Sequence, residues 1–498
     1  MIYNFNLGIG WASSGVEYAQ SYRAKILRKI NKPAKFIFTD MFPRDNLIDM
    51  TRNIGFENDE IIWLYTFFSD YEPEPVTYEL KDLEKTLEGQ RYQFEREGKI
   101  GRLIFDGDNN FYRIYFLNEN EEKVHRVEMV SAGYLIRKDY FMSGRVFSEY
   151  YGPLDGKAHL YQRRFFNRDG SVAYEEIIDD KSVMYKLSDK IICTKEELIG
   201  AMTAALEPKP EDVIIIDRAT GQAQAILENA GEAKVGVVIH ADHFSEGATD
   251  EDNILWNNYY EYTFAMNQHI DFYITATEEQ RRLLISQFEK YMGVSPTVYT
   301  IPVGSLPELK HPTGKRKKHS FITASRLATE KHVDWLVDAV CEAKKQVPDI
   351  SLDIYGKGGA EKELNEQIKR LGAEGYIRLM GQHDLTDIYK NYEGYLSAST
   401  SEGFGLTLME AIGSGLPIIG FDVRYGNQNF IDQGQNGYKL PYTIGMERKR
   451  RQQKLVDSIV KLCNEDDIAK FSDHSYKKAK AYLTDEVELK WKSLIEQV

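Results

Sequence analysis

Short apolar runs alternate with amphipathic helical segments in two separate blocks of this sequence, and no other feature constrains the fold as strongly. The first block begins with a strand at residues 2–7 and a helix from about Gly15 to Ile30. It resumes at residues 213–291, where we expect a helix from about Asn253 to Gln268. The second block occupies residues 320–421. Alternation of this kind is typical of parallel sheets covered by helices. We therefore expect two doubly wound α/β domains, with ligands bound in the cleft between them.

A segment of different character interrupts the first block. Residues 101–188 alternate aromatic and polar positions, as in FYRIYFL and LYQRRFF, and turn sequences divide them into short runs. A period of two predicts an antiparallel β-meander. Because such a sheet has exposed edges and aromatic faces, we expect it to bind another protein. The alternative is an insertion that only stabilises the domain.

These patterns predict how the chain is divided. A stretch rich in Pro, Gly and Lys at residues 301–318 indicates a linker between the two blocks. The expected parts are the first portion of an N-terminal Rossmann-like domain (1–76), an inserted β-rich domain (77–190), the second portion of the N-terminal domain (191–304), a C-terminal Rossmann-like domain (305–480) and a C-terminal helix (481–498).

Composition excludes several classes of protein. With 42% hydrophobic and 28% charged residues and a net charge of −14, the sequence is typical of a globular protein that does not bind nucleic acid through its whole surface. The basic runs at 315–318 and 448–451 are either solvated faces or local partner sites. Cys193, Cys341 and Cys463 are far apart, which predicts neither disulfides nor a cysteine zinc site and indicates a cytoplasmic protein. We expect no signal peptide and no membrane-spanning helix.

The stretch from Ser397 to Asp422 contains the first candidate site. It predicts a strand, a glycine-containing turn and a helix, with Glu402 just before the helix and Glu410 roughly 8 Å along its axis. Backbone N–H groups at Gly403–Leu406 would face an anion. Two carboxylates so spaced suit the two ends of a nucleotide diphosphate sugar. Taken alone, the two glutamates are also explained without a ligand, as one helix-capping residue and one solvated residue.

Other polar loops follow other predicted strands. Arg326 to Lys331 come after FITAS, in the expected loop and first turn of a helix. Arg326 and Lys331 would bind a diphosphate there, each charged hydrogen bond contributing about 1.5–3 kcal/mol. Glycine-containing loops occur at 355–359 and 381–385. His240 ends a strand of the first block, which suits either a site residue or a structural histidine. A further glycine loop before Gly15 predicts a phosphate or sugar cradle, although its spacing does not match a dinucleotide fingerprint.

Four ordered segments in the second block carry a family resemblance: SRLATEKHVDWLVDA, YGKGG, GQHDL and SEGFGLTLMEAIGSGLPII. Together they resemble the nucleotide domain of retaining GT-B glycosyltransferases of family 4. With MIYNFNLGIGWASSGVEYAQ, FIFTDMF, VIHADHF and the β-rich insertion, the whole chain resembles the catalytic subunit of the protein O-glycosyltransferase linked to the accessory Sec pathway of Gram-positive bacteria. The resemblance implies an α/β GT-B fold, with two Rossmann-like domains facing a central cleft and an antiparallel β-meander inserted in the N-terminal domain.

The resemblance also implies a function. Members of that family transfer N-acetylglucosamine from UDP-GlcNAc to Ser and Thr hydroxyls of serine-rich-repeat adhesins before export. The implied partners are a non-catalytic co-chaperone paralogue, held through the β-rich insertion, and the Ser/Thr-rich adhesin. The implied location is the cytoplasm, with peripheral contact on the cytoplasmic face of the membrane. One alternative is a wall teichoic acid (polyol phosphate) α-glucosyltransferase. A second is a non-catalytic chaperone or binding module of the same fold.

Site residues follow from the matched motifs. In the family pattern basic residues neutralise the departing diphosphate, the second glutamate accepts the ribose hydroxyls, and the first contacts the sugar. The implied catalytic residues are His240, Arg326, Lys331 and Glu402. Sugar binding is implied for His240, Glu402, Gly403 and Phe404. UDP binding is implied for Gly15, Val16, Glu17, Tyr18, Arg326, Lys331, Gln382, His383, Gly403, Phe404, Gly405, Leu406 and Glu410.

Neither a metal nor another cofactor is expected. Basic side chains and a helix N-terminus suffice to stabilise the leaving diphosphate. The acceptor hydroxyl then attacks the same face of the sugar and passes its proton to the leaving phosphate, which retains the α configuration without a covalent enzyme nucleophile. Asp106 and Asp108 have the letters of the metal-binding Asp-x-Asp of GT-A enzymes, but their surroundings predict a hairpin turn instead.

Overall fold

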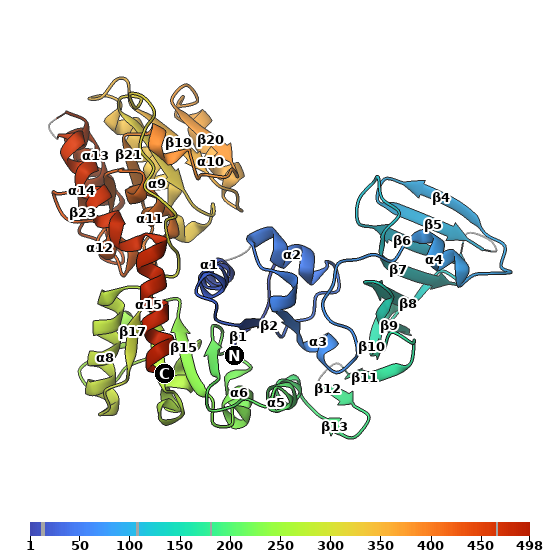
Figure 1. Ribbon diagram of the computed structural model, residues 1–498. Coiled ribbons are helices and arrows are strands. Elements are labelled where there is room, and N and C mark those ends of the chain that lie inside the picture. Colours follow the sequence, from blue (N-terminus) through green and yellow to red (C-terminus); the bar gives the residue numbers. More distant parts are fainter. Residues whose placement is uncertain (11–14, 106–108, 180–181, 465–466) are drawn as a thin grey trace. The chain divides into compact units, whose positions relative to one another are not determined.

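The computed structural model describes residues 1–10, 15–105, 109–179, 182–464 and 467–498 (Figure 1). The turn expected at Asp106–Asp108 lies outside the described residues. The chain divides into two compact units, residues 1–237 with 258–271 and residues 238–257 with 272–498. Across the described part of the chain, no helix combines the length and the apolar character needed to cross a membrane.

The first unit contains a parallel sheet. In its centre the first strand of the chain, β1 (Ile2–Asn6), pairs in parallel with β14 (Val213–Ile216) on one side and with β2 (Ala34–Phe38) on the other. The strand order is β15 (Lys234–Ile239), β14, β1, β2 and β3 (Ile61–Trp63). All four residues of β14, VIII, are buried, as is typical of a strand covered on both faces.

Helices of the first unit follow or connect these strands. They are α1 (Gly15–Lys29), α2 (Leu47–Ile54), α3 (Leu64–Phe67), α4 (Leu80–Lys85), α5 (Lys195–Ala205), α6 (Ala223–Asn229) and α7 (Glu261–Ala265). A buried ion pair holds α1 against the sheet, because the two terminal nitrogens of the Arg23 guanidinium each donate to an oxygen of Asp217 at 2.8 Å. Gln20 donates to the same carboxylate at 2.8 Å, and Asn6 donates to Gln20 at 3.0 Å. This network fixes the N-terminal half of α1 beside the ends of β1 and β14.

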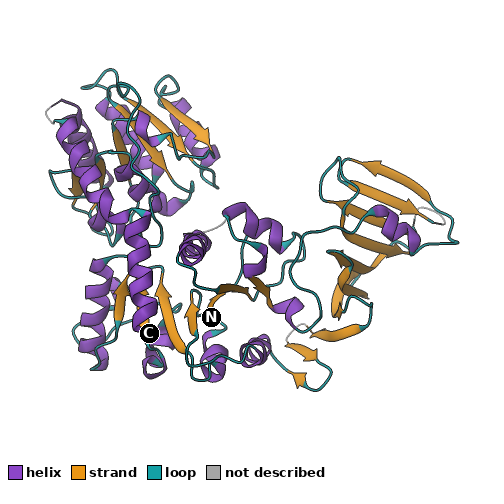
Figure 2. Cartoon of the chain, in the orientation of Figure 1, coloured by secondary structure: helices purple, strands orange, loops and turns teal. Residues whose placement is uncertain are grey.

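In its described residues the insertion forms ten antiparallel strands paired in sequence order. Figure 2 draws this part of the chain mostly as strands. It comprises β4 (Gln93–Glu97), β5 (Ile100–Ile104), β6 (Phe111–Phe116), β7 (Val124–Ser131), β8 (Tyr134–Phe141), β9 (Arg145–Leu154), β10 (Lys157–Phe166), β11 (Val172–Asp179), β12 (Ser182–Lys186) and β13 (Ile191–Ile192). Leu80 and Leu83 of α4 join a core with Leu103, Ile114 and Val127 of the sheet. The meander extends beyond residues 101–188 at both ends, by β4 and β13. The alternating pattern did not include these two strands, because β4 is mostly exposed and β13 has only two residues.

A row of opposite charges crosses six neighbouring strands of this sheet. Its members stand directly opposite one another in the order Arg113, Glu128, Lys138, Glu149, Arg163 and Glu176. Arg163 contacts Glu149 at 3.0 Å and Glu176 at 2.8 Å, and Arg113 contacts Glu128 at 3.1 Å. Cross-strand pairs of opposite charge favour one register over its neighbours. The row therefore helps to fix the pairing of β6 to β11.

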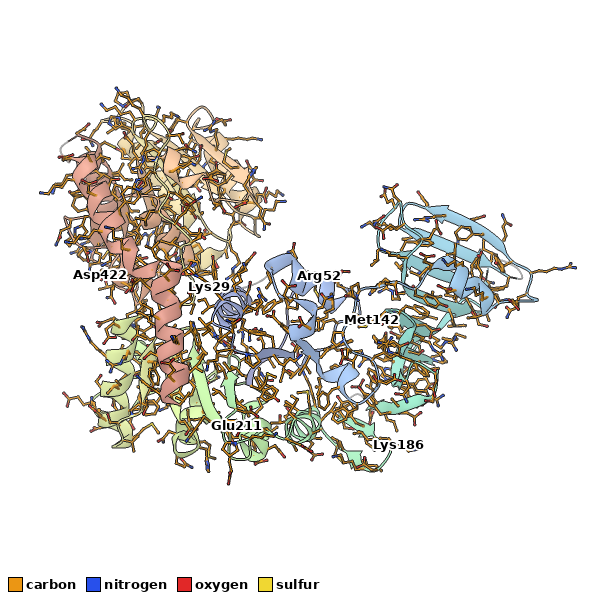
Figure 3. All side chains as sticks on the ribbon, viewed as in Figure 1. Lys29, Arg52, Met142, Lys186, Glu211 and Asp422 are labelled. Atoms are coloured by element: carbon orange, nitrogen blue, oxygen red, sulfur yellow. The ribbon has the colours of Figure 1, made fainter. Side chains whose placement is uncertain are left out.

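The second unit contains a six-stranded parallel sheet. Its strand order is β20 (Ile377–Gly381), β19 (Ser351–Tyr355), β18 (Ser320–Ala324), β21 (Gly394–Ser397), β22 (Ile418–Phe421) and β23 (Gly437–Leu440). This is the doubly wound order. The first strand, β18, lies in the middle, the next two are added on one side of it, and the last three are added on the other side. Neighbouring residues of β18 point to opposite faces, where Phe321 and Ile322 belong to separate cores. Figure 3 labels Asp422, which directly follows β22.

Helices cover both cores of this sheet. They are α9 (Val333–Ala343), α10 (Glu361–Arg370), α11 (Leu406–Gly413), α12 (Gly426–Phe430), α13 (Arg448–Asn464) and α14 (Ile468–Ala479), and α15 (Thr484–Gln497) follows them in the chain. The unit also includes β16 (Phe272–Thr275), α8 (Glu278–Met292) and β17 (Val298–Thr300), and β16 pairs in parallel with β17. The segment expected to be a linker is tied to this unit. Arg316 donates to the carbonyl oxygens of Lys390 and Gly415 at 3.2 and 3.1 Å.

Two local predictions are wrong. The helix expected from about Asn253 to Gln268 is reduced to α7 and a 3-10 turn at Asn267–His269. Trp256 instead forms a bridge with Phe244, so tertiary contacts override helical spacing. Lys331 was expected in the first turn of a helix, but it ends a separate 3-10 turn, Thr329–Lys331, before α9 begins.

Candidate active site

Three loops meet at the carboxyl edge of the six-stranded sheet, after β18, β19 and β20. The N–H of Gly356 donates to Gly381 at 2.8 Å. A Cβ added at Gly356 would lie 1.9 Å from the oxygen of Ser325, and one at Gly358 would lie 2.4 Å from the oxygen of Leu327. Gly356 also has a φ of 129°, which side chains rarely allow. The glycines of YGKGG therefore let this loop pack against the loop that carries Arg326.

Lys331 and Glu402 form the closest contact between two predicted site residues. The Nζ atom of Lys331 lies 2.6 Å from a carboxylate oxygen of Glu402, and their side chains are only 16% and 21% exposed. The N–H of Thr400 donates to Glu330 at 3.4 Å and links the same two loops. Arg326 is different, because its side chain is 71% exposed and pairs with Glu330 at 3.2 Å.

Glu410 lies one turn into α11 in an apolar setting. The Tyr389 hydroxyl donates to it at 2.9 Å. Burial nevertheless raises the pKa of Glu410 from 4.5 to about 7. α11 begins after Gly405, whose φ of 88° is left-handed, so the helix N-terminus and its amide groups start beside Glu402. Glu402 thus precedes the helix N-terminus, whose backbone donors attract anions, and Glu410 lies one turn beyond it.

The turn itself packs closely on its neighbours. The Phe404 side chain is buried and stacks edge-on against Phe430 and Tyr482, so only its backbone is available to a ligand. A Cβ at Gly403 would lie 2.6 Å from the oxygen of His240. The structure therefore brings His240, which follows β15, against the turn that carries Glu402. Leu406 is the first residue of α11.

A set of residues that the sequence did not indicate holds this turn. The N–H of Glu402 donates to Arg424 at 3.1 Å, and the N–H of Tyr425 donates back to the Glu402 carbonyl at 2.6 Å. The Tyr425 hydroxyl lies 3.2 Å from Nδ1 of His243, whose Nε2 donates to Gln287 at 2.7 Å. Burial lowers the pKa of His243 to about 4, so this ring is neutral at pH 7. These contacts join the loops after β22, β21 and β15.

Arg424 adds positive charge near the same turn. Its guanidinium lies 3.6 Å from Asp242 and 3.4 Å from Glu246, and it covers the ring of Phe244 at 4.6 Å. Burial raises the pKa of Asp242 above its ordinary value, with Arg424 opposing that rise. No local signal identified these residues, because RYGNQN is typical of a turn and its partners are far away in the sequence.

The remaining predicted residues lie at two other places. Gln382 and His383 are exposed after β20, where His383 Nε2 donates to Met380 at 2.8 Å and the ring meets Tyr355 edge-on. Gly15, Val16, Glu17 and Tyr18 form the first turn of α1 in the first unit, and there Val16 and Glu17 are buried while Tyr18 is 40% exposed. The roles of these residues stay predictions.

Comparisons with known proteins agree with this geometry. A family model described as glycosyl transferases group 1 matches residues 318–465, and one described as the GtfA extended beta-sheet domain matches residues 93–189. The UDP-N-acetylglucosamine–peptide N-acetylglucosaminyltransferase GtfA subunit of Streptococcus gordonii is 51% identical over 498 residues, covering 100% of this chain and 98% of that protein. The glycosyl transferases group 1 model covers the six-stranded sheet, and the GtfA extended beta-sheet model covers the meander.

Two crystal structures are similar over the full length. One is the pneumococcal O-GlcNAc transferase GtfA in complex with UDP and GlcNAc, with 47% identity, a TM-score of 0.94 and coverage of 100% of this chain and 98% of that one. The other is a GtfA/B complex, with 51% identity, a TM-score of 0.95 and coverage of 100% and 99%. The expected GT-B fold is confirmed. The chain belongs to the GtfA-subunit family of UDP-N-acetylglucosamine–peptide N-acetylglucosaminyltransferases, which are glycosyltransferases of group 1.

Proposed function

We propose that this protein transfers N-acetylglucosamine from UDP-N-acetylglucosamine to Ser or Thr hydroxyls of a polypeptide, with retention of the α configuration. The observation that carries the proposal is the 2.6 Å contact between Lys331 and Glu402. It places a cation suited to a diphosphate beside a carboxylate suited to sugar hydroxyls. Glu410, one turn into α11, accepts the ribose hydroxyls. Membership in the GtfA-subunit family supports this choice of donor and acceptor.

The chemistry needs stabilisation of the leaving group. Negative charge builds on UDP as the bond between the anomeric carbon and the diphosphate oxygen breaks. Lys331, Arg326 and the backbone N–H groups at the start of α11 stabilise this charge. The acceptor hydroxyl forms the new C–O bond on the same face, and its proton passes to the leaving phosphate oxygen. His240 and Glu402 orient the sugar during this step. The enzyme itself contributes no covalent nucleophile.

Metal independence is part of the proposal. Lys331 and the helix N-terminus supply the positive charge that a divalent cation supplies elsewhere. The rate should therefore be unchanged in EDTA. Loss of activity in EDTA that Mg²⁺ or Mn²⁺ restores would contradict this part of the proposal without touching the choice of donor.

The inserted sheet is the proposed surface for protein partners. We assign to it a paralogous GtfB-type subunit, because a related chain occurs in a GtfA/B complex, and a Ser/Thr-rich polypeptide as the substrate. Apolar side chains exposed on its strands include Tyr134, Ile136, Tyr161, Ile177 and Met184. Apolar side chains of this kind are suited to a protein interface. We also propose a cytoplasmic location with peripheral contact at the membrane face, which a flotation assay with anionic vesicles tests.

Labelled donors test the activity directly. The purified protein with its partner subunit is offered UDP-GlcNAc or UDP-glucose, together with a Ser/Thr-rich peptide or a polyol phosphate. Transfer of GlcNAc to the peptide is the expected result. Transfer of glucose to the polyol phosphate would favour a teichoic acid glucosyltransferase. Tight UDP binding without turnover of any pair would favour a non-catalytic binding module.

A further inference from the structure

Three flat groups are stacked directly beside Lys331. The rings of His332 and Trp335 lie 3.6 Å apart between centroids with an interplanar angle of 10°. On Trp335 the guanidinium carbon of Arg451 lies 3.4 Å from the ring centroid. Trp335 also packs edge-on against Phe421 of the sheet core. The stack therefore connects the residue after Lys331 to the interior of the unit.

Each member of the stack comes from a different local structure. His332 directly follows the 3-10 turn that Lys331 ends, and its φ of 45° is a left-handed conformation disfavoured by a side chain. Trp335 lies in the first turn of α9, and Arg451 lies in the first turn of α13. Lys331 is thus joined directly to the one residue of the stack that has a left-handed backbone.

The basic run at 448–451 is thereby explained. Arg448 pairs with Asp338 of α9 at 2.6 Å, and Gln452 donates to the Asp338 carbonyl at 3.3 Å. Together with Arg451 on Trp335, these contacts hold the start of α13 on α9. Two members of the run thus act within the fold, whereas the neighbouring Arg450 is exposed.

We infer that the stack of His332, Trp335 and Arg451 holds Lys331 in position for the diphosphate of the donor. The inference rests on the proposed function, because it requires Lys331 to contact that group. The stack holds the left-handed residue in one conformation, which keeps Nζ of Lys331 beside Glu402 and available to the diphosphate of the donor. His332 and Arg451 are positioning residues, since they act through Lys331.

Replacing His332 by glycine separates positioning from stability. Glycine adopts the left-handed conformation without strain, so His332→Gly should leave Tm unchanged or higher while it frees the turn. Glu207 has a φ of 49° and is the matched control, because Glu207→Gly relieves the same strain elsewhere. We expect kcat and UDP affinity to fall about tenfold in His332→Gly and to stay at the wild-type value in Glu207→Gly. Arg451→Gln should resemble His332→Gly, and Arg450→Gln should be neutral.

A double-mutant cycle shows whether His332 acts through Lys331. UDP affinity, measured by calorimetry, should be equal in Lys331→Ala and in Lys331→Ala combined with His332→Gly. Additive losses would overturn the inference, as would a His332→Gly variant with wild-type affinity and kcat. A fall in Tm that accounts for the lost activity would overturn it as well. If Lys331→Ala alone keeps full affinity and turnover, the proposed function of the site fails instead.

Discussion

Nζ of Lys331 lies 2.6 Å from the carboxylate of Glu402, although 71 residues separate them in the sequence. Each group partly neutralises the other until a donor molecule binds. Loss of one charged hydrogen bond to the diphosphate costs about 1.5–3 kcal/mol, which corresponds to a roughly 10- to 150-fold lower kcat/KM. The same pair is therefore the first target for mutation.

Lys331→Ala and Glu402→Ala should each lower turnover by at least that factor while the complex with the partner subunit still forms. Steady-state kinetics and size-exclusion chromatography check the two outcomes. Lys345→Ala is the control, because Lys345 is an exposed lysine in the turn after α9, where it pairs with Glu342. Full activity of either site variant would refute the assignment of the site.

Glu410 should make nucleotide binding release protons near neutral pH. Its raised pKa, about 7, means that the folded, ligand-free protein favours the protonated carboxyl, and the associated stability is lost as pH rises through 7. In the proposed site the ribose hydroxyls of UDP donate to the ionised carboxylate, which lowers the pKa of Glu410 on binding. UDP affinity should therefore increase with pH through about 7.

Calorimetry in buffers of different ionisation enthalpy measures the released protons. The Glu410→Gln variant is the control, because it keeps the shape of the side chain and cannot titrate. The wild-type protein should release more protons than the variant at pH 6.5. Equal release would show that this carboxyl does not meet the nucleotide.

The two glycines at either end of Gly356–Gly359 should respond differently to alanine. A Cβ at Gly356 would overlap the Ser325 oxygen at 1.9 Å, whereas at Gly359 a Cβ meets no described atom within 4 Å. Gly356→Ala should lower the free energy of unfolding by about 3 kcal/mol and weaken UDP binding, and Gly359→Ala should change neither by much. Urea unfolding and calorimetry test the pair. Equal stability of the two variants would contradict the close packing of these loops.

Exposed apolar residues of the meander should control complex formation and leave the sugar site intact. Tyr161→Ser and Ile177→Ser replace side chains that are 45% and 42% exposed. Each should weaken the complex with the GtfB-type subunit at least tenfold, with donor affinity unchanged. Lys186→Ser, at an exposed polar residue of β12, is the control. A complex of unaltered affinity in both variants would count against this surface.

Local sequence patterns predicted the elements that bury continuous apolar runs, such as VIII at β14, because burial on both faces leaves little freedom in composition. They also identified Glu402, Glu410 and the glycine loops, since each of these follows a strand at a short, fixed distance. The helix expected near Trp256 shows the opposite case. There a bridge to Phe244 decided the backbone, and no local pattern carries that information.

The supports of the site were not predictable for the same reason. His243 and Tyr425 lie 182 residues apart, and only the folded chain brings the hydroxyl to the imidazole. Arg451 was interpretable as a solvated charge until the structure placed it on Trp335. Short motifs therefore revealed groups proposed to touch the ligand, and the fold revealed the groups that hold them.

The row of charges from Arg113 to Glu176 changes sign at every strand, and chain direction in a meander also changes at every strand. Both alternations have a period of two. Removing or duplicating one hairpin preserves both, whereas gaining or losing a single strand would set like charges face to face. Insertions and deletions that keep the meander intact should therefore add or remove a whole hairpin of two strands.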